Sequence, residues 1–294
     1  MHPLIEKLIA NGPVTTDGAW GTELQARGLA IGEFPDAWNL THPELVTEVA
    51  QAYLAAGSQI ILTNTFGANR VRLGDPDLSD QADGIDRAGV LISRQAANGS
   101  ALVFASIGPS GKLLLNQEIT GDELRRAFAD QAHSLAAAGA DALVIETMSD
   151  LTEARLAVAG SRDTGLPVVA CMVFDSGKNK DRTMMGAAPE EAAEALTHAG
   201  ADVIGANCGQ GIAGFAAICR RLRTATDRPI WLKPNAGLPQ VVAGCAEYQI
   251  TPEEFSFFIP DLIAAGANFL GGCCGAGPAF ISAIRAQISA PVKL

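Results

Sequence analysis

The chain has 294 residues, of which 48% are hydrophobic and 18% charged, so it can bury a sizeable core as one large or two modest domains. Its formal net charge is −11 and no run of lysine and arginine occurs, which argues against nucleic acid or an anionic membrane surface as a partner. No apolar run reaches membrane-spanning length and the N-terminus resembles no signal or transit peptide. The six cysteines are therefore expected to be reduced thiols in the cytoplasm.

Apolar strands and helical segments alternate along the chain. Four joints share one pattern, an alanine-rich helix end followed by a glycine, a short polar step and an apolar strand, at Gly57, Gly139, Gly200 and Gly266. Such short joints are typical of βαβ units with parallel strands. The predicted strands are 14–17, 59–65, 102–107, 142–147, 167–174, 202–207, 229–234 and 268–272. The predicted helices include 43–56, 80–97, 122–138, 151–164, 189–199, 214–224, 252–265 and 278–287.

Eight alternating pairs without a linker or a shift in composition predict a single (β/α)₈ TIM barrel, with residues 1–294 as one domain. The rival fold is a doubly wound open sheet. It is disfavoured because no glycine-rich dinucleotide fingerprint follows the first strand. In a barrel of this kind the carboxyl ends of all eight strands form the active face.

Two cysteine motifs stand at predicted strand ends. Cys273 and Cys274 are flanked by glycines after strand 268–272, and Cys208 follows strand 202–207. Neighbouring residues of a strand point to opposite faces, so adjacent thiols converge only where the strand ends, and glycine permits that turn. Three sulfurs with one open position are typical of a catalytic zinc ion.

The alternative is that these cysteines are small buried hydrophobic residues, which is the usual role of a free cysteine. We interpret Cys171, Cys219 and Cys245 in that way, because they lie in apolar or helical settings.

The strand-end motifs together resemble the homocysteine S-methyltransferase family, which includes the homocysteine-binding domain of cobalamin-dependent methionine synthase and betaine–homocysteine methyltransferase. The resemblance covers essentially the whole chain and rests on residues 17–22, 63–66, 106–109, 207–209, 234–237 and 271–275. It implies a zinc enzyme that methylates the thiol of homocysteine to give methionine. It also implies that Cys208, Cys273 and Cys274 are both the zinc ligands and the catalytic centre.

The resemblance implies roles for two acidic residues as well. Asp17 and Glu146, at the ends of the first and fourth strands, are expected near the amino group of homocysteine. The alternatives are a helix cap for Asp17 and a buried ion pair for Glu146.

Three further residues are candidates for substrate contacts. Ser106 and the turn around Gly108 could present backbone amides to the substrate carboxylate, or form an ordinary loop. Asn64 could orient homocysteine. Asn235 could turn toward zinc when substrate is absent, or be a plain turn residue.

The methyl donor is expected to be a small onium compound, with betaine ahead of S-methylmethionine. Betaine-using relatives hold the quaternary ammonium with aromatic side chains, but Gly67 and Thr147 stand where they have tyrosine. Trp20 and Trp38 could build a different cage.

Two alternatives to this function remain. Residue 294 follows the last helix closely, so we expect no corrinoid or folate domain, and a separate corrinoid protein is the other methyl source. A non-catalytic, structural zinc barrel would need a fourth protein ligand. None of His2, His42, His133 and His198 lies in a strand-end motif. A homo-oligomer is compatible with the sequence.

Overall fold

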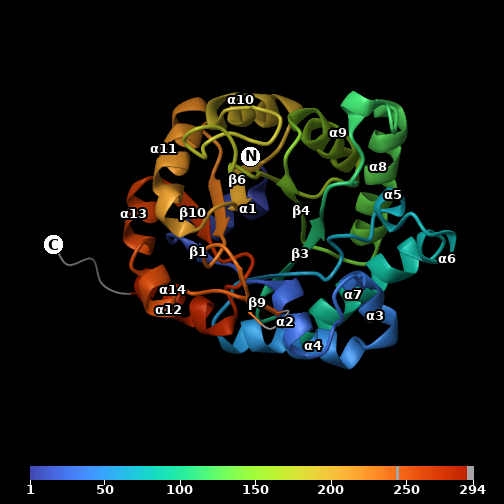
Figure 1. Cartoon of the computed structure of the whole chain (residues 1–294), viewed down its shortest axis with the longest axis horizontal. Coiled ribbons are helices and arrows are strands. Elements are labelled where there is room, and N and C mark those ends of the chain that lie inside the picture. Colours follow the sequence, from blue (N-terminus) through green and yellow to red (C-terminus); the bar gives the residue numbers. More distant parts are fainter. Residues whose placement is uncertain (243–244, 290–294) are drawn as a thin grey trace.

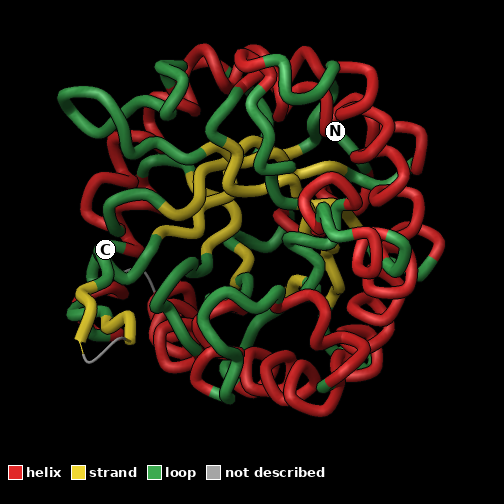
Figure 2. The backbone as a smooth tube through the Cα atoms, turned by 45° about the vertical axis from the view of Figure 1, so that its right-hand side comes forward, coloured by secondary structure: helices red, strands yellow, loops and turns green. Residues whose placement is uncertain are grey.

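A computed structural model describes residues 1–242 and 245–289, without the side chains of 241–246. Its main sheet has eight parallel strands in the order β1-β10-β7-β6-β5-β4-β3-β2, surrounded by helices (Figure 1 and Figure 2). The strands are β1 (Val14–Thr15), β2 (Ile60–Leu62), β3 (Leu102–Ile107), β4 (Ala142–Met148), β5 (Val168–Met172), β6 (Val203–Cys208), β7 (Ile230–Pro234) and β10 (Ala267–Leu270). The predicted (β/α)₈ barrel is confirmed.

The barrel closes between β1 and β2 through only a few contacts. The Gln59 amide donates to the carbonyl of Thr15 at 2.9 Å. Higher up, the Leu62 amide donates to the Asp17 carboxylate at 2.7 Å. The Asp17 side chain thus replaces part of the backbone hydrogen bonding that joins the other neighbouring strands.

Helices follow the strands around the outside of the barrel. Their bounds are α1 (Pro3–Ile9), α2 (Trp20–Ala26), α3 (Trp38–Thr41), α4 (Pro43–Ala55), α5 (Arg70–Leu73), α6 (Pro76–Ser79), α7 (Ala82–Ala97), α8 (Gly121–Ala137), α9 (Leu151–Ser161), α10 (Pro189–Ala199), α11 (Phe215–Ala225), α12 (Pro252–Ser256), α13 (Ile259–Ala264) and α14 (Pro278–Ser289). None of the helices in the described part is long and apolar enough to span a membrane.

The structure differs from the prediction in several elements. The predicted helix 252–265 is two helices, α12 and α13, because Pro260 has no amide hydrogen for the Ser256 carbonyl and its ring would clash there. The short helices α1, α2, α3, α5 and α6 were not expected. Neither was the antiparallel hairpin of β8 (Gln240–Val242) and β9 (Cys245–Glu247), which stands apart from the barrel sheet (Figure 2).

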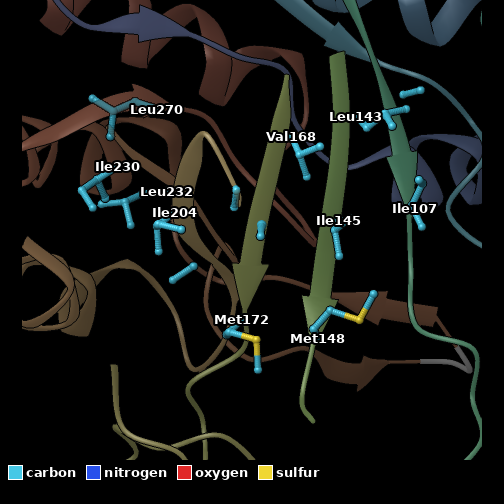
Figure 3. Packing of buried hydrophobic residues seen from close by; sticks show 14 of the residues in the cluster. Ile107, Leu143, Ile145, Met148, Val168, Met172, Ile204, Ile230, Leu232 and Leu270 are labelled. Atoms are coloured by element: carbon cyan, nitrogen blue, oxygen red, sulfur yellow. The ribbon is translucent and has the colours of Figure 1, made fainter. Parts of the chain in front are cut away.

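Side chains on the barrel strands alternate between two apolar clusters. The outer cluster fills the space between sheet and helices and includes Leu143, Ile145 and Leu232 (Figure 3). The inner cluster includes Phe104, Trp231 and Phe269, with the Trp231 ring stacked on Phe104 at a centroid distance of 6.0 Å. Two residues further along the strands, the inward-facing side chains are polar, and the candidate site lies at that level.

Candidate metal centre and substrate cavity

The structure brings the three predicted zinc-ligand cysteines together at the carboxyl ends of β6 and β10. The sulfur atoms of Cys208, Cys273 and Cys274 all lie within 4.8 Å of one another. The sulfurs of Cys208 and Cys273 are 3.0 Å apart. Gly275 has a φ of +79°, and a Cβ atom there would lie 2.2 Å from the ring of Tyr248. Glycine is therefore required where the chain turns away from the adjacent thiols.

The donor set of this cluster fits zinc. Three sulfur ligands suit a borderline-soft cation, and no histidine or carboxylate joins the cluster among the described residues. Hydrogen bonds with Cys273 and Cys274, and then burial, raise the pKa of Cys208 well above its ordinary value. Thiolates crowded in this way need a cation to remain ionised together, which is what a metal ion supplies.

Asn207 fastens the cluster to β4, a role that the sequence analysis missed. Its side-chain oxygen accepts from the Thr147 amide at 2.8 Å, and its side-chain nitrogen donates to the Thr147 hydroxyl at 2.7 Å. The same nitrogen lies 3.6 Å from the Cys208 sulfur and 3.8 Å from that of Cys273. Thr147 and Cys208 have φ values of +62° and +59°, uncommon for residues with a Cβ, so this network holds strained backbone in place.

A cavity of about 600 Å³ opens above the cluster. The three cysteines line it together with Glu146, Ser106 of β3 and residues from the loops after β1 and β2. Its other notable lining residues are Trp20, Phe34, Asn64, Phe66, Arg72, Thr147 and Lys233. A cavity of this volume admits a small thiol together with a small second substrate.

Glu146 is the carboxylate of the lining that lies on the barrel strand β4, beside Thr147 and the cysteines. Its Oε1 atom accepts a hydrogen bond from the Ser106 hydroxyl at 2.5 Å. Burial raises the pKa of Glu146 to about 7, and the nearby Lys233 ammonium opposes the rise. A buried, partly ionised carboxylate favours a ligand that brings its own positive charge.

The backbone amides proposed for the substrate carboxylate already have partners. The Ser106 amide donates to the Thr63 hydroxyl at 3.1 Å, and the Gly108 amide donates to the Phe66 carbonyl at 2.8 Å. The expected carboxylate site at these two amides does not fit this arrangement. Ser106 instead presents its hydroxyl to Glu146.

Asp17 is fully buried and is not among the residues that line the cavity. One carboxylate oxygen accepts from the Trp20 indole at 2.6 Å and from the Leu62 amide at 2.7 Å. The other accepts from the Lys233 ammonium at 2.5 Å. The expected contact with the substrate amino group therefore does not fit Asp17, whose two oxygens are taken by the protein.

Lys233 is the second residue that the sequence analysis missed. It stands two positions after the inward-facing Trp231, so strand alternation could have placed it inside the barrel. A lysine there needs an acidic partner, and Asp17 is the strand-end acid within reach.

Asn64 and Asn235 are held by the protein in different ways. The Asn64 side-chain nitrogen donates to the Pro35 carbonyl at 2.7 Å and to the Asn39 side chain at 3.0 Å. The Asn235 side-chain nitrogen donates to the Gly209 carbonyl at 2.9 Å, while its oxygen is buried without a partner in the described residues. Their contacts with ligands stay predictions.

The two tryptophans proposed for the donor have different environments. Trp20 lines the cavity, and its indole is oriented by Asp17. Trp38 is buried in the core, with its ring 4.5 Å from that of His42, and does not line the cavity. The cage that included Trp38 is therefore wrong, since α3 turns this ring inward. Phe34 and Phe66 are the other aromatic residues of the lining.

Comparison with known proteins identifies the family of this chain. A family model described as homocysteine S-methyltransferase matches residues 14–288. The chain belongs to this family.

Two methionine synthases match most of this chain. Methionine synthase from Mycobacterium tuberculosis is 33% identical over an alignment of 292 residues that covers 93% of this chain and 24% of that protein. The Mycobacterium leprae methionine synthase is 31% identical, over 97% of this chain and 25% of that protein. The chain thus spans about a quarter of the length of these relatives.

Solved structures agree on the fold. The metallated form of the homocysteine methyltransferase MmuM from Escherichia coli has a TM-score of 0.80 at 24% identity, covering 97% of this chain and all of that one. Its apo form has a TM-score of 0.76 with the same coverage.

Proposed function

We propose that this chain transfers a methyl group to the thiol of homocysteine in a zinc-dependent reaction that gives methionine. The observation that supports it most is the convergence of three cysteine sulfurs at one end of a cavity that Glu146 also lines. A thiol acceptor with an amino group matches both features.

Cys208, Cys273 and Cys274 would hold the zinc ion. When bound, zinc supplies positive charge that lowers the pKa of a thiol ligand, so the thiol reacts as a thiolate at neutral pH. The Asn207 amide donates toward two of the cysteine sulfurs, which fixes their directions. A structural zinc site would need a fourth protein ligand, which the described residues do not offer.

Glu146 binds the ammonium group of homocysteine in this proposal. The Ser106 hydroxyl holds the carboxylate in one orientation, so the amino acid end is fixed and the thiol points at the cysteines. The thiol proton leaves to solvent. A sulfur lone pair then forms the new bond to the methyl carbon, while the bond from that carbon to the donor breaks and its electron pair stays on the leaving atom.

The donor is a small onium compound, with betaine ahead of S-methylmethionine. The aromatic rings of Trp20, Phe34 and Phe66 line the cavity and can face a cation. The second candidate is a methyl group carried by a separate corrinoid protein, favoured by the 33% identity to a methionine synthase. A cytoplasmic location and a homo-oligomer stay predictions.

The test is a donor screen on one zinc-loaded preparation. Purified protein receives homocysteine with betaine, S-methylmethionine or a methylated corrinoid protein, and methionine is measured. Turnover with an onium donor supports the whole proposal, and turnover only with the corrinoid protein replaces the donor. No methionine with any of the three refutes the function.

A further inference from the structure

Lys233 brings a buried positive charge to the wall of the substrate cavity. The residue is 2% exposed, yet it is among those that line the cavity beside Cys208 and Cys273. Its ammonium group donates to Asp17 at 2.5 Å, which is its only hydrogen bond within the described part of the chain. An ammonium has three N–H donors, so two remain for a ligand.

The two backbone amides that were expected to bind a carboxylate are taken by the protein. The amides of Ser106 and Gly108 bond to protein oxygens. Glu146 and the three sulfurs are acceptors or anions, and they repel a carboxylate. The α-carboxylate of an amino acid that enters with its thiol toward the cysteines therefore needs a cation close to Glu146. Lys233 is such a cation, because it lines the same cavity as Glu146, and its positive charge opposes the rise that burial causes in the pKa of that group.

We propose that Lys233 binds the carboxylate of the acceptor thiol and makes the site specific for an amino acid. The inference rests on the proposed function and extends it to a residue of β7. Glu146 and Lys233 then form a matched pair for a zwitterion, one taking the ammonium group and the other the carboxylate. Asp17, which does not line the cavity, holds the lysine in place.

Arg72 is the other cation of the lining, and it is the competitor for this role. It is exposed to solvent, where a charge contributes less to binding than a buried one does. A buried Lys233 loses little side-chain entropy on binding, because Asp17 already orders it. The buried residue is therefore the stronger candidate.

The experiment compares homocysteine with 3-aminopropane-1-thiol, the same molecule without its carboxylate, using the donor found active in the screen. The ratio of kcat/KM for the two thiols measures how the carboxylate is used. Variants are Lys233→Met, Lys233→Arg and Arg72→Gln. Lys233→Met leaves the buried Asp17 carboxylate without its partner and could unfold the barrel. The double variant Asp17→Asn/Lys233→Met avoids this because it removes both charges together.

We expect Lys233→Met and the double variant to lower the ratio by about 10- to 100-fold, the range for a hydrogen bond to a charged group. The loss should lie mainly in KM for homocysteine, and Lys233→Arg should restore part of it. An equal loss for both thiols would assign Lys233 a purely structural role and overturn the inference. A fall in this kcat/KM ratio in Arg72→Gln alone would assign carboxylate binding to Arg72 instead.

The inference and the proposed function fail in different ways. A wild-type protein that methylates neither thiol refutes the function, and this inference with it. A wild-type protein that methylates homocysteine with an unchanged ratio in the double variant refutes only the role of Lys233.

Discussion

The lower and upper layers of the barrel interior lie two residues apart on the same strands, yet their chemistry is opposite. The lower layer is a dry stack of apolar side chains around Trp231. The upper layer holds buried ionisable groups and thiols. The pairs along the strands are Phe104 and Ser106, Val144 and Glu146, and Trp231 and Lys233.

The two layers therefore differ in how their side chains contribute to the stability of the fold. In the lower layer the rings of Phe104, Trp231 and Phe269 are stabilised by packing against one another. In the upper layer Glu146 is desolvated without full compensation, which is why its pKa rises to about 7. A bound ammonium group would supply that compensation, so the upper layer gives up some stability for binding.

The largest effect is expected from the metal cluster. Changing Cys208 to alanine should remove most of the zinc and abolish turnover, because two protein sulfurs do not hold the ion. The barrel should stay folded by circular dichroism. Cys219→Ala is the matched control, since that buried cysteine lies on α11 outside the cluster and should keep its zinc. Full zinc occupancy in Cys208→Ala, measured by metal analysis, would contradict the assignment.

The next effect belongs to the lower layer. Trp231→Ala should reduce the free energy of unfolding by about 3–5 kcal/mol, the range for deleting a large buried ring. Trp231→Phe should cost less, because most of the stack with Phe104 remains. Denaturant titration measures both. Molecules that are still folded should keep their zinc, and a variant that loses zinc without losing stability would show that the two layers are not separate.

A smaller effect is expected from Glu146. Glu146→Gln keeps an acceptor for the Ser106 hydroxyl but removes the charge, so homocysteine should bind about 10- to 100-fold more weakly. Zinc content should not change, because Glu146 is not part of the sulfur cluster. Calorimetric titration with homocysteine gives the affinity. Equal affinities for both proteins would leave Glu146 with a structural role only.

The smallest effect is a pH dependence of binding. The pKa of Glu146 is raised to about 7, so below that pH the group is mostly a neutral acid and binds an ammonium group poorly. From pH 8 to pH 6 this factor alone should weaken homocysteine binding by about tenfold. Release of the thiol proton gives a further dependence of the same sign. Glu146→Gln should retain only that second part, and identical slopes in both proteins would exclude a contribution from Glu146.

The sequence predicted those parts of the molecule that depend on the position along a strand. The eight strands and the convergence of Cys208 with Cys273 and Cys274 followed from strand ends that must share one face. Which inward residues meet across the barrel depends on strand tilt and stagger, so the pairing of Lys233 with Asp17 was missed. Trp38 was misplaced because the orientation of a short helix that follows a single 3₁₀ turn is set by tertiary packing.

The seam between β1 and β2 has a consequence that reaches beyond the site. The carboxylate of Asp17 anchors the Leu62 amide, so the same side chain that orders Lys233 also fastens the first strand to the second. The Leu62 amide hydrogen is therefore a local reporter. Its exchange with deuterium measures how often the seam opens, and a ligand that tightens the charged layer slows this exchange.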